Sequence, residues 1–557
     1  MPSTGAGGWR EGLLALVVSA LLAVALTWPL APGLARIGRD DADGRFSIWN
    51  VAWVAHALTT DPRHVFDANI FYPHHGTLAY SENNLVAGAF GIPVWIATHN
   101  ANATHNSVVL IAFALAAAAM YVLALRLIGD RRAAAVSAVC YAFCPYVFSH
   151  MAHIQLLMTA GLPLAMLAFH RLADRPGAVR GAVLGVAIAG QALACGYYGI
   201  FVVLMVGFAT LVTASVRRLW TRPAFWGALG TGAVVAVVII APAYAPYAAL
   251  QRAGFDRGLD GARFYSPNWS AYLASSSYAH AWMLGLIAPW KNEVAFPGFV
   301  PVIFGAAGIS WALARRSAAG RPQALNLPAS ARETLGIYGG LAGLGFWASF
   351  GPTAGLYTVL YRLIPAFGLL RAPGRFALVV AFGLAVLAGI GVAALLARVR
   401  SANLVGCVVV AAAAAEFVVP LQLPQAPPVD PVYRVLATLP RGPVIEMPFY
   451  YPAVGLFQHT KYMVASTAHW MPLVNGYSDY IPPDFYDHVN LLAPFPSRDA
   501  FRILQPGHVR YAVFHMYGYN DENRRDVVAR LAEFAPYLRP LYEHEGTRLY
   551  EIVGYPK

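Results

Sequence analysis

Long apolar runs recur through most of the chain and constrain its fold more than any other feature. Hydrophobic residues make up 58% of the sequence and charged residues only 12%, above the roughly 45–50% apolar content of soluble domains. We therefore expect an α-helical polytopic membrane protein. About eleven runs are candidate crossings, near residues 12–32, 107–125, 133–149, 154–170, 181–195, 197–214, 224–247, 297–314, 334–350, 376–397 and 403–420. The first run is too long for a signal-peptide core, so we expect a retained helix.

The basic residues give the expected orientation of these crossings. The net charge is +12, and arginines cluster in alternate loops, at 126–132, 171–180, 217–222, 315–332 and 398–400. The positive-inside rule places those loops and the N-terminus in the cytoplasm. Segment 181–214 could be one long helix, but "CGYYG" at its centre is typical of a turn, and two crossings preserve the pattern. The charge thus indicates topology and lipid headgroups, with no nucleic acid as a partner.

The domain organisation follows from where polar segments interrupt the apolar runs. We expect a transmembrane domain over 1–423, with a first outer loop at 33–106, and a C-terminal extracytoplasmic domain over 424–557. Strand-like runs at 443–449, 510–516 and 548–553 alternate with helix candidates at 431–439, 497–504 and 521–534, which predicts a small α/β fold. At about 130 residues, this domain can bury a core of its own.

The densest acid cluster directly follows the first apolar run. In "IGRDDADGRFSIWNVAW" three carboxylates, Asp40, Asp41 and Asp43, precede a segment whose aromatic residues recur at helical spacing. We expect an interfacial helix with its aromatic side in the headgroups, and its dipole would favour an acid at its start. The acids could be solvated loop residues, or they could act as a general base or hold a cation.

Other polar residues are expected on the same side of the membrane. Glu82 precedes a short apolar segment, 85–99, that we interpret as an interfacial or re-entrant helix; Glu82 could be its N-cap or a second acid facing a site. Candidate substrate-binding residues lie at two turns between helices: His150, His153 and Gln155 at one, Tyr197 and Tyr198 at the other. Satisfied turn residues and ordinary interfacial aromatics are the alternatives.

Two arginines break the charge rule by falling on the outer side. Arg371 and Arg375, in "LLRAPGRF", are four residues apart and would share a face if the segment is helical. Two guanidinium groups at a polar–apolar boundary suit a lipid phosphate, although they could also be headgroup anchors.

The C-terminal domain contains one further polar and aromatic stretch. In "HWMPLVNGYSDY", His469, Asn475 and Asp479 accompany aromatic residues. This stretch could contact a sugar acceptor or pack the domain.

Taken with these motifs, the chain resembles the GT-C class of membrane glycosyltransferases, which includes the protein O-mannosyltransferase and aminoarabinose-transferase relatives. The stretches "DADGRFSIWNVAWVAHAL", "NIFYPHHGTLAYSE", "SHMAHIQLL" and "RAPGRF" also look like a group of uncharacterised bacterial membrane proteins described as glycosyltransferases. This resemblance covers most of the chain.

The resemblance implies an enzyme of the bacterial cytoplasmic membrane. It would transfer sugar on the outer face from a polyprenyl-phosphate-linked donor to an unknown glycan, lipid or protein acceptor. An acid of the first loop would act as base or metal ligand, with Asp43 preferred, then Asp41, then Asp40. Arg371 and Arg375 would hold the donor phosphate. A divalent cation, Mg²⁺ or Mn²⁺, would be held by Asp41 and Asp43 if one is used.

Two other functions remain open from the sequence. One is a catalytically inactive scaffold of the same fold. The other is a lipid or polysaccharide transporter, which needs ionisable residues along a path through the membrane. Glu416 is the main acid within the expected crossings.

Overall fold

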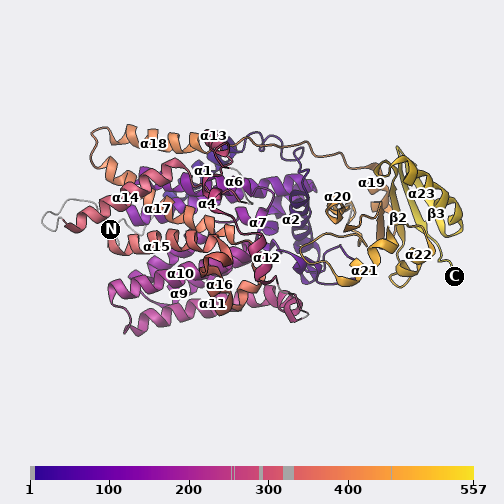
Figure 1. Cartoon of the computed structure of the whole chain (residues 1–557), viewed down its shortest axis with the longest axis horizontal. Coiled ribbons are helices and arrows are strands. Elements are labelled where there is room, and N and C mark those ends of the chain that lie inside the picture. Colours follow the sequence, from indigo (N-terminus) through magenta and orange to yellow (C-terminus); the bar gives the residue numbers. More distant parts are fainter. Residues whose placement is uncertain (1–6, 253, 256, 288–292, 318–330, 453–454) are drawn as a thin grey trace. The chain divides into compact units, whose positions relative to one another are not determined.

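The computed structural model describes residues 7–252, 254–255, 257–287, 293–317, 331–452 and 455–557 (Figure 1). The chain forms two compact units. The first comprises residues 1–32 and 109–422, and the second comprises 33–108 and 423–557. The first loop therefore belongs to the same unit as the C-terminal segment.

The first unit is a bundle of apolar helices (Figure 1). Its main helices are α1 (Gly7–Leu26), α4 (Ala101–Ile128, which begins in the second unit), α5 (Arg131–Ala142), α6 (Pro145–Ser149), α7 (Ile154–Leu157), α8 (Gly161–Asp174), α9 (Ala178–Ala194), α10 (Gly196–Arg217), α11 (Pro223–Arg252), α12 (Gly258–Phe264), α13 (Ala281–Leu284), α14 (Phe299–Ser317), α15 (Ala331–Ser349), α16 (Leu356–Leu363), α17 (Ala377–Leu396) and α18 (Ala402–Glu416). Helix α17 is buried along nearly its whole length and packs against α5, α14 and α15.

Seven helical segments of the described chain are long and apolar enough to cross a membrane. They are Trp9–Leu26, Ala101–Ile128, Arg131–Ser149, Ile154–Asp174, Gly196–Arg217, Pro223–Arg252 and Pro373–Leu396. Shorter apolar helices are Leu85–Thr98, Ala178–Ala194, Phe299–Trp311 and Ala402–Glu416. Helix α15 occupies the expected crossing at 334–350 but is in neither set. The break expected within 181–214 is present, because α9 ends at Ala194 and α10 begins at Gly196.

The second unit contains two helices from the first loop, α2 (Ala42–Thr60) and α3 (Leu85–Thr98). Its C-terminal part holds β1 (Val444–Met447), β2 (Tyr511–His515), β3 (Leu538–His544) and β4 (Thr547–Ile552), with α19 (Pro431–Thr438), α20 (Thr460–Ala465), α21 (Pro483–Leu492), α22 (Arg498–Leu504) and α23 (Asp521–Glu533). The sheet order is β1-β2-β4-β3; β1 and β2 are parallel and the other pairs are antiparallel. This confirms the small α/β domain.

Backbone hydrogen bonds join the first loop to the C-terminal segment within this unit. The amides of Phe71 and Tyr72 donate to the carbonyls of Asn475 and Leu473 (3.1 and 2.8 Å), and the amide of Leu473 donates to Asn69. Leu473 also forms a parallel bridge with Val444 of β1. The first loop is therefore an integral part of this fold.

Candidate functional site

The acid cluster lies at the start of α2. Asp41 is the N-cap residue, and its Oδ1 accepts a hydrogen bond from the amide of Gly44 at 2.6 Å. Asp43 lies within the first helical turn rather than before the helix, and all three acids, with Asp40, are exposed. Gly44 is required by the close packing here, because a Cβ would lie 2.6 Å from the Arg39 Cβ and 2.8 Å from Asp41 Oδ2.

Two arginines accompany these acids. The Arg45 Nε donates to Thr460 Oγ1 at 2.9 Å, and its Nη1 bonds the carbonyl of Asp40. Burial lowers the pKa of the Arg39 and Arg45 guanidinium groups, while the nearby Asp41 and Asp40 raise it. The cluster is therefore partly neutralised by cations of the same unit.

No group of three or more His, Cys, Asp or Glu side chains with metal-binding geometry is found in the part of the chain that the structure describes. A Mg²⁺ ion is often held by only one or two carboxylates together with water. The exposed carboxylates of Asp41 and Asp43 fit that modest requirement, although one Asp41 oxygen already caps α2.

The aromatic residues of α2 face the interior of the second unit. Trp49 is 1% exposed and its Nε1 donates to Asn69 Oδ1, while Trp53 donates to the Val65 carbonyl and packs edge-on against Trp470. The expectation that this side lies in the headgroups was wrong, because the sequence could not show that the C-terminal segment covers it. These aromatic residues instead hold α2 in place.

Glu82 is not the cap of the following helix. The N-cap position of α3 belongs to Asn84, and the Asn83 Oδ1 accepts from the Leu85 amide at 3.0 Å. Glu82 is half-buried, and its carbonyl accepts from Asn50 of α2.

The arginines of the first unit lie in a turn that leads into α17. Arg375 belongs to a 3₁₀ segment, Pro373–Phe376, and Arg371 precedes it in a stretch that is neither helix nor strand. They do not share a helical face, because Pro373 interrupts the segment. Both nevertheless contact Tyr197, whose hydroxyl accepts from the Arg371 amide at 2.7 Å and whose ring lies 3.9 Å from the Arg375 guanidinium carbon.

The segment after α5 brings further polar side chains, Tyr146 and His150, next to the arginine turn. The hydroxyls of Tyr146 and Tyr198 lie 3.3 Å apart, and the His150 ring packs on the Tyr146 ring with 4.3 Å between centroids. His150 Nε2 lies 3.1 Å from Glu293 Oε1. Glu293 in turn lies against the arginine turn, since a Cβ on Gly374 would come 2.6 Å from its Oε2.

Of the seven site residues predicted in this unit, five therefore form one connected cluster, and the other two, His153 and Gln155, lie outside it. His150, Tyr197, Tyr198, Arg371 and Arg375 are connected through the contacts above. The His153 ring lies 6.4 Å from that of His150, and Gln155 is buried in α7.

Sequence reasoning missed Tyr146 and Glu293. Tyr146 lies within "FCPYVFSH", four residues before His150, and this spacing could have drawn attention to it. Glu293 lies in a segment without helical or strand periodicity and carried no signal.

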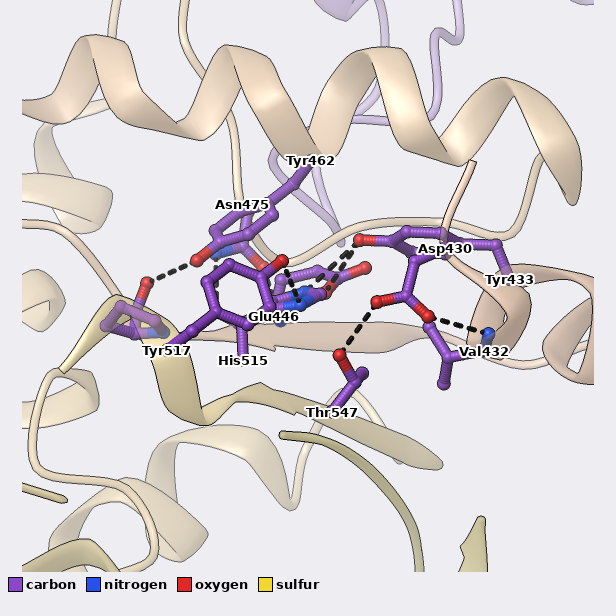
Figure 2. Close-up of polar contacts among 10 residues, drawn as sticks. Asp430, Val432, Tyr433, Glu446, Tyr462, Asn475, His515, Tyr517 and Thr547 are labelled. Atoms are coloured by element: carbon purple, nitrogen blue, oxygen red, sulfur yellow. Dashed lines mark hydrogen bonds and ion pairs between the residues drawn. The ribbon is translucent and has the colours of Figure 1, made fainter. Parts of the chain in front are cut away.

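Within the polar stretch of the C-terminal segment, Asn475 belongs to a buried network in the second unit (Figure 2). Asn475 is fully buried and bonds both backbone groups of Glu446, at 2.7 and 3.0 Å. His469 stacks on Tyr433 with 5.8 Å between ring centroids. Both residues therefore pack the domain, whereas the Ser81 hydroxyl donates to Asp479 at 2.9 Å.

Comparisons with known proteins agree with this architecture. No protein-family model matches the sequence, and no curated protein matches it significantly. A solved structure of the arabinofuranosyltransferase AftD from mycobacteria is similar over 98% of this chain, with a TM-score of 0.50 at 16% identity. The chain has a GT-C fold. The similar region corresponds to 41% of the AftD chain, so this chain spans less than half the length of AftD.

A second solved structure is similar over nearly the whole of both chains. The apo structure of ArnT from Cupriavidus metallidurans matches over 98% of both chains at 15% identity, with a TM-score of 0.42. The helical segments that are long and apolar enough to cross a membrane indicate a multi-pass membrane protein.

Proposed function

We propose that this chain is a GT-C glycosyltransferase that moves a sugar from a polyprenyl-phosphate-linked donor to an acceptor on the outer face of the bacterial cytoplasmic membrane. The observation that carries the proposal is the arginine turn before α17. This turn lies at the end of the bundle where α5 stops and α10 and α17 start. Tyr197 accepts from the Arg371 amide and lies beneath the Arg375 guanidinium, while the Arg371 guanidinium lies over the Tyr265 ring, 5.2 Å from its centroid. Guanidinium groups fixed in this way suit a phosphate group.

The proposed reaction is a displacement at the anomeric carbon of the donor sugar. The acceptor hydroxyl gives its proton to the carboxylate of Asp43 and forms a new bond to this carbon. The bond from the carbon to the phosphate oxygen breaks, and its electron pair leaves with the polyprenyl phosphate. Arg371 and Arg375 stabilise the additional negative charge.

The alternative role for these acids is to hold a divalent cation. Asp41 and Asp43 would then be its ligands, the cation would supply further positive charge when bound, and Asp41→Asn would lower transfer as Asp43→Asn does. The arginine loops support a cytoplasmic N-terminus, which would put the first loop and the C-terminal segment on the outer side.

The transporter alternative loses its main support. Glu416 accepts a hydrogen bond from His280 at 2.8 Å and also bonds the amides of Phe299 and Val300 at the start of α14. This carboxylate therefore stabilises a helix end.

Binding of undecaprenyl phosphate to the full-length protein in lipid nanodiscs tests the phosphate site. We expect Arg375→Met to weaken binding roughly 10- to 100-fold, because a hydrogen bond to a charged group contributes about 1.5–3 kcal/mol. The matched control is Arg263→Met, which removes an exposed arginine paired with Asp260 and should bind as the wild type does. Equal binding by the wild type and Arg375→Met would contradict the assignment of the site.

Transfer is tested separately from binding. Lipid extracts from cells lacking the protein should accumulate a polyprenyl-phosphate sugar, and purified protein should consume it when acceptor membranes are added. If the wild type binds the lipid phosphate but never consumes the accumulated donor, the chain is a scaffold.

A further inference from the structure

The hydrogen bonds of His150 and Glu293 restrict where this pair of side chains can carry protons. His150 Nδ1 lies 2.7 Å from the carbonyl oxygen of Tyr146, which can only accept. This nitrogen therefore carries a proton. His150 Nε2 faces a carboxylate oxygen of Glu293 at 3.1 Å, so one further proton must lie between these two atoms.

While this proton is present the pair has no net charge, whether the proton is bound to His150 Nε2 or to Glu293 Oε1. Loss of the proton would leave the Nε2 lone pair facing a carboxylate, and the pair would carry one negative charge. The side chains of His150 and Glu293 are only 13% and 10% exposed, so water would screen that charge poorly.

Glu293 is connected to the arginines by steric contact. A Cβ on Gly374 would lie 2.6 Å from Glu293 Oε2, 2.9 Å from its Cγ and 3.1 Å from its Cδ. Gly374 is the residue immediately before Arg375. The Glu293 side chain therefore limits where the backbone that carries Arg375 can lie.

Several other groups face the pair and share its electrostatic environment. Ser149 Oγ lies 3.1 Å from His150 Nδ1, and the rings of Tyr146 and His153 lie beside His150. Tyr272 and Tyr146 are further titratable groups near Glu293, and Tyr146 is also near Arg375.

We propose that Glu293 and His150 are positioning residues of the phosphate site, holding the turn of Arg371 and Arg375 through Gly374 and sharing one proton. This inference rests on the proposed function. While the shared proton is present, the His150–Glu293 pair has no net charge that competes with a lipid phosphate for the arginines. Once it is lost, the carboxylate competes with the phosphate for the guanidinium groups.

A double-mutant cycle tests the positioning role with undecaprenyl phosphate as the probe and the full-length protein in nanodiscs. We expect Glu293→Ala and Gly374→Ala each to weaken binding about tenfold, which corresponds to about 1.4 kcal/mol. Because Gly374→Ala would act by displacing Glu293, the double variant should bind no more weakly than either single variant. The matched control is Gly343→Ala in α15, where a Cβ meets nothing within 4 Å.

A pH series tests the shared proton. The affinities of the wild type and Glu293→Gln are compared at each pH, so that ionisation of the phosphate cancels. We expect the ratio of wild-type to variant affinity to fall as the pH rises, by at most about tenfold per pH unit for one proton. Glu416→Gln, in the His280–Glu416 pair that caps α14, is the control for removing a buried carboxylate and should follow the wild type.

The outcomes separate the two proposals. If the wild type binds no undecaprenyl phosphate at any pH, the proposed function fails and this inference fails with it. If the wild type binds it but the double variant loses the sum of both single losses, or the ratio stays constant with pH, the inference alone is overturned.

Discussion

Asp41 and Asp43 lie two residues apart but have different surroundings. Asp41 caps α2 through the Gly44 amide, whereas Asp43 lies within the first turn, where the helix dipole favours a negative charge. Asparagine preserves a cap as well as aspartate does. A base, in contrast, needs a carboxylate. Replacing each aspartate by asparagine can therefore distinguish a capping role from a role as catalytic base.

We expect Asp43→Asn to abolish sugar transfer and Asp41→Asn to leave it largely intact. Asp41→Ala, which removes the cap, should lower the free energy of unfolding by about 1 kcal/mol. Donor consumption and thermal unfolding of the purified protein measure both effects. Undiminished transfer by Asp43→Asn would remove this residue as the base, and loss with Asp41→Asn would move the role there.

A buried carboxylate in the second unit depends on one histidine. Glu446 is fully buried in β1, and its Oε2 lies 2.8 Å from His515 Nε2 (Figure 2). The other ring nitrogen of His515, Nδ1, forms a hydrogen bond with the hydroxyl of Tyr517 at 3.0 Å. Burial raises the pKa of Glu446, and the His515 hydrogen bond opposes this shift.

We expect His515→Ala to destabilise the second unit by about 3–5 kcal/mol at neutral pH, because the side chain of the buried Glu446 would keep only a long hydrogen bond from the Tyr433 hydroxyl, at 3.5 Å. A raised folded-state pKa favours the folded state at low pH, and this contribution is lost as the pH rises through that pKa. The loss of unfolding free energy in His515→Ala should therefore become smaller as the pH falls towards about 4.3, the pKa of a glutamate in the unfolded chain. Hydrogen exchange of β1 and β2 in the full-length protein measures it. A pH-independent cost would contradict the explanation.

The candidate site was only partly predictable from its residues. Arg371 and Arg375 stood out because they break the charge rule, and both are in the cluster, although Pro373 prevents the shared helical face. Glu293 could not be found, because its role depends on a chain fold that brings it against Gly374. Trp49 and Trp53 were assigned to the wrong environment, because the residues that enclose them lie far along the sequence. Trp53 packs on Trp470, and Asn69, which bonds Trp49, is itself held by Ser466 and Met471.

At the level of elements, strong local signals were reliable. The strands expected at 443–449, 510–516 and 548–553 are β1, β2 and β4, and Ser497 and Asn520 cap α22 and α23. Strand β3 was missed because it is an edge strand whose residues are mainly exposed and which contains Pro540, so it lacks a regular apolar alternation. Its hairpin turn, Glu545–Gly546, has positive φ at both residues but lacks the usual Asn-Gly signal.

Close contact between α14 and α17 depends on two glycines. A Cβ on Gly391 would collide with the carbonyl of Phe304, and one on Gly308 would collide with the carbonyl of Leu387. Small residues permit such an approach of helices in a membrane. We expect Gly391→Ala to force the helices apart and to lower the melting temperature of the purified protein. Gly339→Ala, where a Cβ meets nothing within 4 Å, is the control and should melt with the wild type.

At the scale of the whole molecule, the boundary in the fold differs from the boundary in the sequence. The sequence predicted a C-terminal domain over 424–557 with a core of its own. The structure instead combines residues 423–557 with the first loop, 33–108, in one unit. The Asn69 amide group donates to Ser466 Oγ and to the Met471 carbonyl, and Trp470 packs on Trp53 and His56. A chain segment that provides such contacts cannot be removed without exposing its partners.

Removal of residues 424–557 should therefore unfold the first loop. The backbone of Phe71 and Tyr72 would lose its hydrogen bonds to Asn475 and Leu473, and buried polar groups without partners are unfavourable. We expect limited proteolysis of the truncated protein to cut within 61–84, a stretch that the full-length protein protects. Co-expression of 424–557 as a separate chain should restore protection, because the lost contacts are non-covalent. Equal protection with and without that segment would show that the first loop folds independently of it, and any loss of transfer on truncation would then belong to the C-terminal segment itself.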